Sequence, residues 1–440
     1  MRDPMAHRVL HQNEFLMEHI FRDLLILLVV IWAVAVVFRR IGLPTIMGEL
    51  IMGVLLGPAV LGWVEPSVII EVLAQLGIFF LLLHTGVETS PREFFAALKK
   101  SLGVATVGAI VPFSVSFGVA LAFGLEIVPA VFVGLTMTAT AVVITLKILY
   151  DLGLKDTRVA RVVVASCVID DLMALVAFSF ALGIIQHGDV DATTLAWIAL
   201  KVTLFFGGGL AIGYWLFPLL KHPFRNRDGH GFTFVLVLGL GYGLVAEAIG
   251  LHIILGAYLA GLFFEEKVAS PELVQKVTDR LEGIAYSFLG PIFFISLGFH
   301  ITFDVLAGDS VAFVIVLTVV LLVGQIVSAA GMARLLKFSW TESASVGIGM
   351  CGRAEMAYVI AALGFQLGAF DASVLSIMIF VTFLANIFTS VGLKLCAPEL
   401  LRLGSTAHLL FDDAEPPAPA DAQYQTHTSS STPSTPGVAD

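Results

Sequence analysis

Two adjacent carboxylates, Asp170 and Asp171, lie inside an otherwise apolar stretch, RVVVASCVIDDLMALVAF. Arg161 marks one end of this stretch, and Asp170 follows it nine residues later. If the stretch is helical, a rise of about 1.5 Å per residue places the pair roughly 13 Å from that end, near the middle of a bilayer core of about 30 Å. A carboxylate at this depth is costly unless it has a partner or a function. We therefore expect this pair to form the functional centre.

A carboxylate in the middle of a membrane is suited to exchanging protons for cations. Its removal from water favours the protonated form, whereas Na⁺ or K⁺ coordinated by hard oxygens favours the ionised form. Neighbouring residues on a helix point about 100° apart, so one carboxylate can face a cavity while protein holds the other. Proton and cation then compete for one site, which is what an antiporter with alternating access requires.

The composition indicates that lipid surrounds most of the chain. Of the 440 residues, 58% are hydrophobic and 13% are charged, which lies outside the range of soluble domains and excludes a water-soluble enzyme. The net charge of −10 leaves no basic patch for a nucleic acid. The three cysteines are far apart in the sequence, so neither a disulfide framework nor a resident metal or other cofactor is expected.

Apolar stretches of about 18 residues or more predict an all-α polytopic membrane protein with thirteen transmembrane helices. Lys and Arg occur only in alternate connections, beginning with Arg39 and Arg40. Because cytoplasmic loops retain positive charge, residues 1–20 should lie outside and residues 401–440 in the cytoplasm, where their acidic, Pro- and Ser-rich composition predicts disorder. The predicted spans are 21–38, 43–63, 68–87, 102–124, 128–150, 159–186, 195–219, 232–249, 251–265, 281–301, 311–333, 342–367 and 372–393.

The sequence also contains an internal repeat. The stretch LGIFFLLLHTG in the third span resembles LGPIFFISLG in the tenth, and the second and ninth spans share a Gly-spaced pattern. Residues 21–186 thus form a first six-helix repeat and residues 232–393 a second, joined by a linker helix at 195–219. A single linker span inverts the second copy in the membrane. Inverted repeats of this kind are a recurring construction of secondary transporters.

Two of the predicted helices contain residues that favour an interruption. The fifth span carries Thr138 and Thr140 in GLTMTATAVVITLKIL, where hydroxyl groups and freed carbonyls could ligate a cation. The twelfth span, its repeat mate, carries three glycines beside Arg353 and Glu355 in SVGIGMCGRAEMAYVI. Interrupted helices at corresponding positions of two halves indicate a transport site. We expect Arg353 and Glu355 to form a structural ion pair that balances the exposed helix ends.

Four motifs, GLPTIMGELIMGVLLGP, TATAVVITLKILYDLGL, VIDDLMALVAF and GRAEMAYVI, together resemble the second monovalent cation:proton antiporter family. This family includes bacterial Na⁺/H⁺ exchangers and the membrane part of Kef-type K⁺ efflux systems, and the resemblance covers residues 20–400. It implies a homodimer with a dimerisation domain and a mobile core domain in which two unwound helices cross. It further implies that Asp171 binds the ion and the proton, that Asp170 assists it, and that Thr140 lies in the first unwound segment.

The eleventh span departs from this resemblance at one position. Electrogenic relatives carry a Lys there that pairs with the first Asp, but this chain has Gln325 in LLVGQIVSAAGMARLL. Gln325 lies nine residues before Arg334, which gives it the same predicted depth as Asp170. A neutral amide can form a hydrogen bond with Asp170 but cannot release a proton. The sequence therefore favours an electroneutral one-for-one exchange.

These observations predict a transporter in the plasma membrane, or inner membrane, rather than an enzyme. The favoured activity is Na⁺/H⁺ antiport, and K⁺/H⁺ antiport or use of Li⁺ is the first alternative. A sodium-coupled symporter of an organic solute, built on the same plan, is a second alternative, which the paired carboxylates disfavour. A channel would need repeated filter elements, and an ATP-driven pump would need a nucleotide-binding motif; the sequence contains neither.

Overall fold

The computed structural model shows a bundle of helices without strands in the part of the chain that it describes. That part comprises residues 4–41, 44–88, 91–141, 157–187, 192–216, 230–262, 271–306 and 308–407, together with Thr145, Ile148, Leu149, Leu152, Leu154 and Phe264. The predicted tail at 401–440 lies mostly outside these residues. Its first seven residues continue the last helix, which ends at Ala407 and is anchored by the buried side chain of Leu400.

The helices of the first half are α1 (Pro4–Ile41), α2 (Thr45–Leu56), α3 (Val68–Glu88), α4 (Pro91–Ala122), α5 (Ile127–Thr136), α7 (Arg158–His187) and α8 (Ala192–Leu216). Those of the second half are α9 (His230–Ala248), α10 (Ile253–Leu262), α11 (Pro271–Ile284), α12 (Gly290–Gly298), α13 (Asp309–Leu335), α14 (Trp340–Gly349), α15 (Glu355–Gln366) and α16 (Ala372–Ala407). A π-helical turn, Ala285–Leu289, joins α11 to α12, and a short 3-10 helix, Phe303–Leu306, precedes α13.

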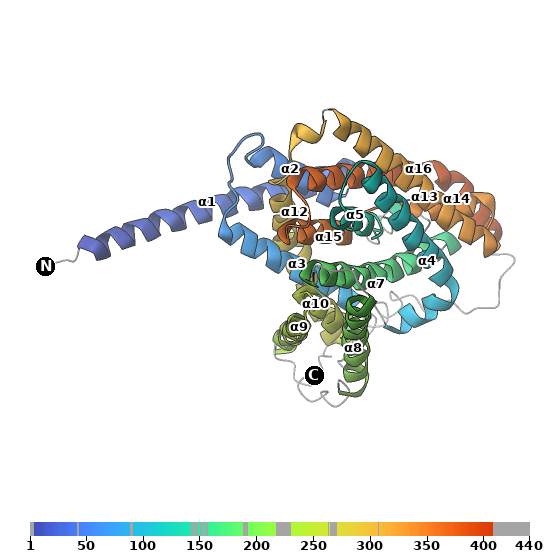
Figure 1. Cartoon of the computed structure of the whole chain (residues 1–440), viewed down its shortest axis with the longest axis horizontal. Coiled ribbons are helices and arrows are strands. Elements are labelled where there is room, and N and C mark those ends of the chain that lie inside the picture. Colours follow the sequence, from blue (N-terminus) through green and yellow to red (C-terminus); the bar gives the residue numbers. More distant parts are fainter. Residues whose placement is uncertain are drawn as a thin grey trace, which may run out of the picture.

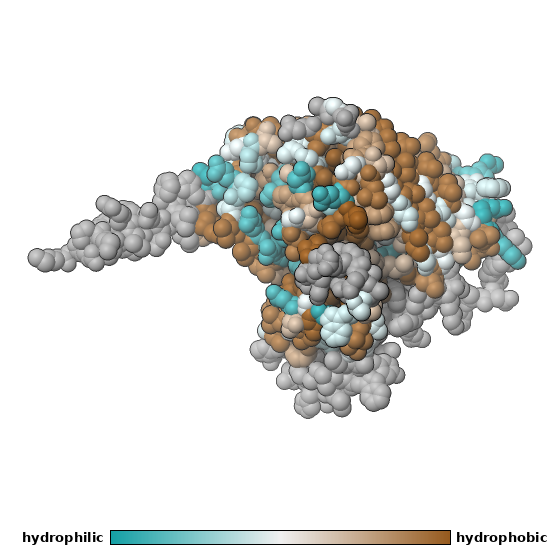
Figure 2. All heavy atoms as spheres, in the orientation of Figure 1, coloured by the Kyte–Doolittle hydropathy of each residue, from teal (hydrophilic) through white to brown (hydrophobic). Residues whose placement is uncertain are grey.

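The chain is a multi-pass membrane protein. Eight of the described helices are long and apolar enough to cross a bilayer, and shorter apolar helices lie between them, among them α2, α5 and α10. Large apolar side chains are exposed along α1, α9 and α13; Trp32, for example, is 69% exposed. Figure 2 shows that hydrophobic residues cover much of the visible face. A surface of this kind is stable against lipid chains and unfavourable in water.

The helices form two groups that are defined by their packing. In the first group, α3 packs against α10 and α12, α2 against α12 and α1, and α9 against α10. In the second group, α4 packs against α13, α7 and α5, while α14 and α16 pack against α13 and α15 against α5. The helix α8 packs against α7. Figure 1 shows α1 projecting from one side of the bundle, whereas α13, α14 and α16 lie at the opposite side.

Glycines allow close backbone contact within the first group. A Cβ atom on Gly53 of α2 would collide with the backbone of α12 at Ile295 and Gly298. In the same way, a Cβ atom on Gly86 of α3 would collide with the backbone of α10 at Tyr258 and Gly261. Small residues promote helix association in membranes because they bring the two backbones into van der Waals contact.

Candidate ion-binding site

The first interrupted helix is α5, which ends at Thr136 in the interior of the second group. Residues 137–141 are not helical, and helical structure is again present at Thr145, Ile148 and Leu149. Thr138 donates its hydroxyl hydrogen to the carbonyl oxygen of Gly134 at 2.8 Å, which satisfies one of the free carbonyls at the end of α5. The remaining backbone groups of this buried segment require partners from elsewhere in the protein.

The second interrupted helix consists of α14 and α15, which are separated by residues 350–354. Ser339 and Glu342 form a capping box that fixes the start of α14. Gly352 lies in the interruption, where an added Cβ atom would be 3.3 Å from Thr145 Oγ1 and 3.4 Å from Ala141 Cβ. A small residue at this position therefore lets the two interrupted segments approach each other.

The two interruptions lie against each other and satisfy each other's backbone groups. The amide of Ala141 donates to the carbonyl of Gly352 at 2.9 Å, and the hydroxyl of Thr145 donates to the carbonyl of Gly349 at 2.9 Å. The guanidinium Nε of Arg353 donates to the carbonyl of Met137 at 2.9 Å. The interruptions predicted from the threonines and glycines are thus present, and they cross within the second group.

Arg353 is the buried cation at this crossing, with no exposed surface. Besides Met137, its guanidinium donates to the carbonyls of Met350, at 2.7 Å, and Gly352, at 3.0 Å. Its remaining nitrogen donates to Gln325 Oε1 at 2.7 Å. The expectation of an ion pair with Glu355 is therefore wrong for the described residues. The carbonyl groups at an interrupted helix carry partial negative charge, and they hold the guanidinium in place of the carboxylate.

Asp170 is fully buried next to this network. Thr140 donates its hydroxyl hydrogen to Asp170 Oδ2 at 3.2 Å, whereas Oδ1 is buried without a hydrogen-bond partner in the described part. Arg353 acts electrostatically on Asp170, although the two side chains do not form a direct ion pair there. Arg353 thus offsets the charge of Asp170 through space.

Gln325 contacts Arg353 rather than Asp170. Its Oε1 accepts the hydrogen bond from the guanidinium, and its Nε2 has no hydrogen-bond partner among the described residues. This nitrogen faces α4, where a Cβ atom on Gly108 would lie 3.2 Å away. The hydrogen bond that the sequence allowed between Gln325 and Asp170 is not formed among the described residues, because Nε2, the donor that the carboxylate would need, faces α4. Gln325 is thus one of the four groups that accept hydrogen bonds from the Arg353 guanidinium.

Asp171 is the carboxylate of the pair without a counter-ion among the residues that the structure describes. Its side chain is 5% exposed and its Oδ1 has no hydrogen-bond partner in the described residues. Glu355, at the first position of α15, is 7% exposed and its Oε2 is likewise unpartnered. Both Glu355 and Asp170 act on Asp171 as like charges. The arrangement therefore has one balanced acid, Asp170, and two unbalanced acids.

An asparagine that the sequence reasoning missed completes the network. The amide of Arg353 donates to Asn386 Oδ1 at 2.8 Å, and Asn386 Nδ2 donates to the carbonyl of Arg353 at 2.6 Å. Asn386 lies in α16, within the apolar stretch VTFLANIFTS, and a lone buried amide in such a stretch is a signal that could have identified it. Thr138, by contrast, bonds to its own helix rather than to either carboxylate.

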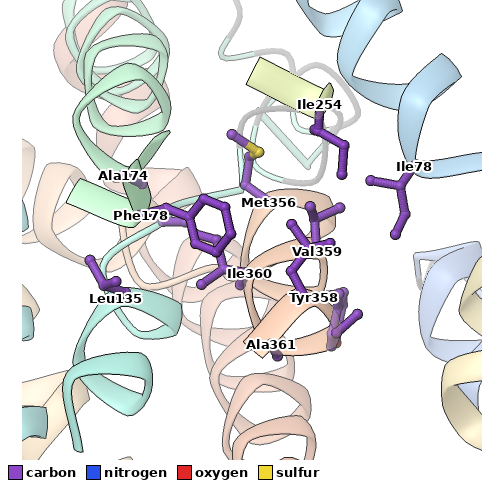
Figure 3. Packing of buried hydrophobic residues seen from close by; sticks show 14 of the residues in the cluster. Ile78, Leu135, Ala174, Phe178, Ile254, Met356, Tyr358, Val359, Ile360 and Ala361 are labelled. Carbon is purple, nitrogen blue, oxygen red and sulfur yellow. The ribbon is translucent and has the colours of Figure 1, made fainter. Parts of the chain in front are cut away.

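An apolar layer lies between Asp171 and the end of α7. Ala174 and Phe178 follow Asp171 on this helix and are buried. Figure 3 shows them packed beside Ile360 of α15, while Ile78 of α3 and Ile254 of α10 approach α15 from the first group. Side chains of both groups thus belong to one buried apolar cluster, which includes the part of α7 that follows Asp171.

Two interrupted helices that cross beside buried carboxylates, in a multi-pass helical membrane protein, define a secondary transporter. The chain belongs to the sodium/hydrogen exchanger family, whose transmembrane family model matches residues 24–397.

Several characterised proteins resemble the chain along most of its length. It is 32% identical over 358 residues to the Na⁺/H⁺-K⁺ antiporter GerN of Bacillus cereus, covering 81% of this chain and 90% of that protein. It is 26% identical over 358 residues to a Na⁺/H⁺ antiporter of Enterococcus hirae, covering 81% and 92%. The fold matches the sodium proton antiporter MjNhaP1 of Methanocaldococcus jannaschii with a TM-score of 0.67 at 18% identity, covering 88% of this chain and 99% of that one.

Proposed function

We propose that the protein is a secondary active antiporter in which a monovalent cation and a proton compete for Asp171. The observation that carries this proposal is the difference between two adjacent buried acids. Asp170 has a hydroxyl donor in Thr140 and a nearby cation in Arg353. Within the described part of the chain, Asp171 has an unpartnered oxygen and acidic neighbours.

The cost of burying an unpaired charge explains why Asp171 needs a ligand. An ionised carboxylate without a partner is unfavourable in a low-dielectric interior, so the group binds a proton or a metal cation. Either ligand neutralises the carboxylate, and both cannot occupy it at once. Oxygen ligands suit Na⁺, K⁺ and Li⁺, and further oxygens could come from the backbone of the interrupted helices. Competition for one carboxylate then links cation movement to proton movement in the opposite direction.

The network around Arg353 favours electroneutral one-for-one exchange. Arginine remains protonated in proteins, and an amide such as Gln325 does not titrate. Asp170 and Arg353 thus offset each other throughout the cycle, and only the ligand of Asp171 changes. In this scheme each cycle moves one cation one way and one proton the other way, without net charge.

We favour Na⁺ as the cation and retain K⁺ and Li⁺ as alternatives. GerN is named a Na⁺/H⁺-K⁺ antiporter, which supports testing K⁺ beside Na⁺. A sodium-coupled symporter of an organic solute would need a further binding site for that solute, and the unbalanced Asp171 provides a direct reason for proton exchange instead.

We infer that the chain has thirteen spans arranged as two inverted six-helix repeats, about 21–186 and 232–393. The contacts support this inference because they occur in corresponding pairs. The packing of α3 on α10 corresponds to that of α12 on α2, and the packing of α4 on α7 corresponds to that of α13 on α16. The close contact between Gly53 and Gly298 likewise corresponds to that between Gly261 and Gly86.

The two helix groups suit different roles in transport. We propose that the first group forms a homodimer interface and that the second group, which holds the carboxylates, is the mobile core. We propose that the protein lies in the plasma membrane or inner membrane. The distribution of Lys and Arg indicates that its amino terminus is outside and its carboxyl terminus is in the cytoplasm. Residues 21–400 then form the transport domain between two terminal segments.

A cation panel in everted membrane vesicles tests the proposed function. Vesicles with an established proton gradient and a fluorescent pH dye should show dequenching on addition of Na⁺, K⁺ or Li⁺ alone, without an organic solute. Asp171→Asn should abolish the response, whereas vesicles that carry the variant should still form the proton gradient. Exchange by the Asn variant would show that the site is wrong, and a response that requires a solute would favour symport.

A further inference from the structure

The turn between α13 and α14 holds an arginine in a fixed position at the surface. Arg334, in the last turn of α13, donates a hydrogen bond from Nη1 to the carbonyl of Phe338. The same guanidinium lies over the ring of Trp340, 4.5 Å from its centroid. Its Nε and Nη2 have no acceptor among the described residues. These two nitrogens form an edge that can bind two oxygens of one phosphate group.

A second arginine contacts the same turn. Arg158, at the start of α7, places its guanidinium over the ring of Phe338, 4.3 Å from the centroid. Phe338 is buried in an apolar cluster that joins the start of α7 to the ends of α13 and α16. Arg158 and Arg334 therefore contact the same residue, one at its ring and the other at its carbonyl group, and two guanidinium groups meet at one short turn.

The third cation of this turn has an unusual backbone conformation. Lys337 has a φ of 64°, in the left-handed region that residues other than glycine rarely adopt. Its amide donates to the carbonyl of Arg334 at 3.0 Å, and the next amide, that of Phe338, donates to Ala333 at 3.1 Å. Glycine fits a helix end of this kind without strain, so the turn itself does not explain a lysine here. The exposed side chain of Lys337 supplies a positive charge next to Arg334.

These three cations have no anionic partner in the described part of the chain. Arg158, Arg334 and Lys337 are all exposed, and none of them forms an ion pair with a described carboxylate. Glu342, the acid that follows the turn, belongs to the capping box of α14, where its carboxylate accepts a hydrogen bond from the amide of Ser339 at 2.8 Å. The described residues of the turn therefore present a surplus of positive charge, which attracts an anion.

Large apolar side chains flank the cations at the surface. Trp340 and Leu335 are each 76% exposed, and Leu336 is 37% exposed. A water-soluble anion would leave these side chains in water, whereas a phospholipid supplies both a phosphate for the cations and acyl chains for the apolar groups. Tryptophan is also enriched at the level of the lipid headgroups. The combination of charge and apolar surface therefore favours a lipid as the ligand.

The site lies at the end of the bundle that we expect to face the cytoplasm. The helix α13 ends there, and α7 and α14 begin there. The buried cluster around Phe338 also includes Leu400, near the end of α16. Figures 1 and 2 show hydrophilic residues gathered beside hydrophobic ones at the side of the bundle where α13, α14 and α16 lie. In the proposed topology this end meets the cytoplasmic leaflet, which carries anionic lipids.

We propose that Arg158, Arg334 and Lys337 bind the phosphate group of an anionic phospholipid in the cytoplasmic leaflet. Trp340 and Leu335 contact the glycerol backbone and acyl chains of the same lipid. The position of Arg334 is fixed, so its free edge donates to two phosphate oxygens, while the other two cations add positive charge. The site belongs to the second helix group, so the lipid is bound to the part of the protein that holds the buried carboxylates.

Thermal unfolding of the purified protein in detergent tests this site. The protein is heated with increasing concentrations of phosphatidylglycerol, and phosphatidylcholine with the same acyl chains is the reference. Phosphatidylglycerol should stabilise wild type more than phosphatidylcholine does. In R158Q/K337Q the phosphatidylglycerol concentration for half-maximal stabilisation should rise about tenfold or more, the loss expected for a hydrogen bond between charged groups.

Two further variants separate the site from general attraction to anionic lipids. R39Q/R40Q is the matched control, because it removes two positive charges from the last turn of α1; it should match wild type. Arg334→Lys keeps the charge but loses the planar fork, so it should also raise the half-maximal concentration about tenfold. Wild-type values in Arg334→Lys would overturn the role given to the guanidinium.

The remaining outcomes decide the identity of the ligand. Equal stabilisation of wild type by the two lipids would overturn the proposal, as would an equal loss in R39Q/R40Q and R158Q/K337Q. Stabilisation by sodium phosphate to the same extent as by phosphatidylglycerol would show a soluble anion as the ligand instead of a lipid. If the double variant does not fold, K337Q provides the same comparison with a smaller shift. These outcomes are independent of the proposed antiport, because lipid binding is measured without transport.

Discussion

Replacing Arg353 by Met should destabilise the protein and uncouple Asp170 from its counter-ion. The guanidinium donates four side-chain hydrogen bonds, to the carbonyls of Met137, Met350 and Gly352 and to Gln325. Methionine has a similar length and no donors, so it leaves these acceptors buried without partners. Removing one member of a buried charged network costs about 3–5 kcal/mol. We expect a loss of this size in the free energy of unfolding.

The assay is a double-mutant cycle of thermal stability. Purified protein in detergent is heated, and the fraction that remains folded is measured by size-exclusion chromatography with fluorescence detection. Arg353→Met alone should lower the apparent melting temperature by several degrees. Adding Asp170→Asn removes the acid that Arg353 offsets, so the double variant should lose less than the sum of the two single losses. The coupling energy between close charged groups is typically about 0.5–3 kcal/mol.

Arg353→Lys provides the matched control. It keeps the positive charge but has three donors on a single atom instead of a planar fork. It should therefore be more stable than Arg353→Met and less stable than wild type. Strictly additive losses in the cycle would refute the conclusion that Arg353 offsets Asp170. Wild-type stability of Arg353→Met would refute the role assigned to the crossing itself.

Three further predictions follow from the contacts. Thr140→Val removes the hydroxyl donor of Asp170 and should change the half-saturating cation concentration by about 10-fold to 150-fold, as expected for a hydrogen bond to a charged group of about 1.5–3 kcal/mol; Thr140→Ser should retain wild-type values. Gly261→Val introduces a side chain where α10 meets the backbone of α3 and should prevent recovery of a monodisperse protein, whereas Gly241→Val, at an open position, should not. Exchange by wild type should be insensitive to a valinomycin-imposed membrane potential; a strong dependence would contradict electroneutral transport.

The helix interruptions could be predicted from the sequence because they depend on local composition. Threonine hydroxyls compete for backbone carbonyls, and glycines permit close approach, so the segments around Thr138 and Gly352 have identifiable signals. The depth of Asp170 and Gln325 in the membrane, estimated from helical rise and the position of a terminal arginine, stays a prediction. These features require no knowledge of how the helices are packed.

The hydrogen-bond partners of Arg353 could not be predicted in this way. Glu355 is two residues from Arg353 in the sequence, and its opposite charge predicted an ion pair between the two side chains. The structure instead brings the carbonyl of Met137, just after α5, and the amide of Gln325 to the guanidinium. The contact with Met137 depends on the crossing of segments that are 216 residues apart in the chain. The role of Asn386 could not be predicted either, because its hydrogen bonds to Arg353 form only in the folded bundle.

The hydrogen bonds that join Ala141 to Gly352 and Arg353 to Met137 hold the two interrupted helices together as one unit. Relative sliding of these segments would break several buried hydrogen bonds at once, so in the antiport proposed above the ion would move together with both interrupted helices. If the second group is the mobile core, as proposed above, opening to the opposite face would come from displacement of the entire unit along α3 and α10. Fluorescent or spin labels placed on α5 and α15 should keep a constant separation through the cycle, while the separation between either helix and α3 changes.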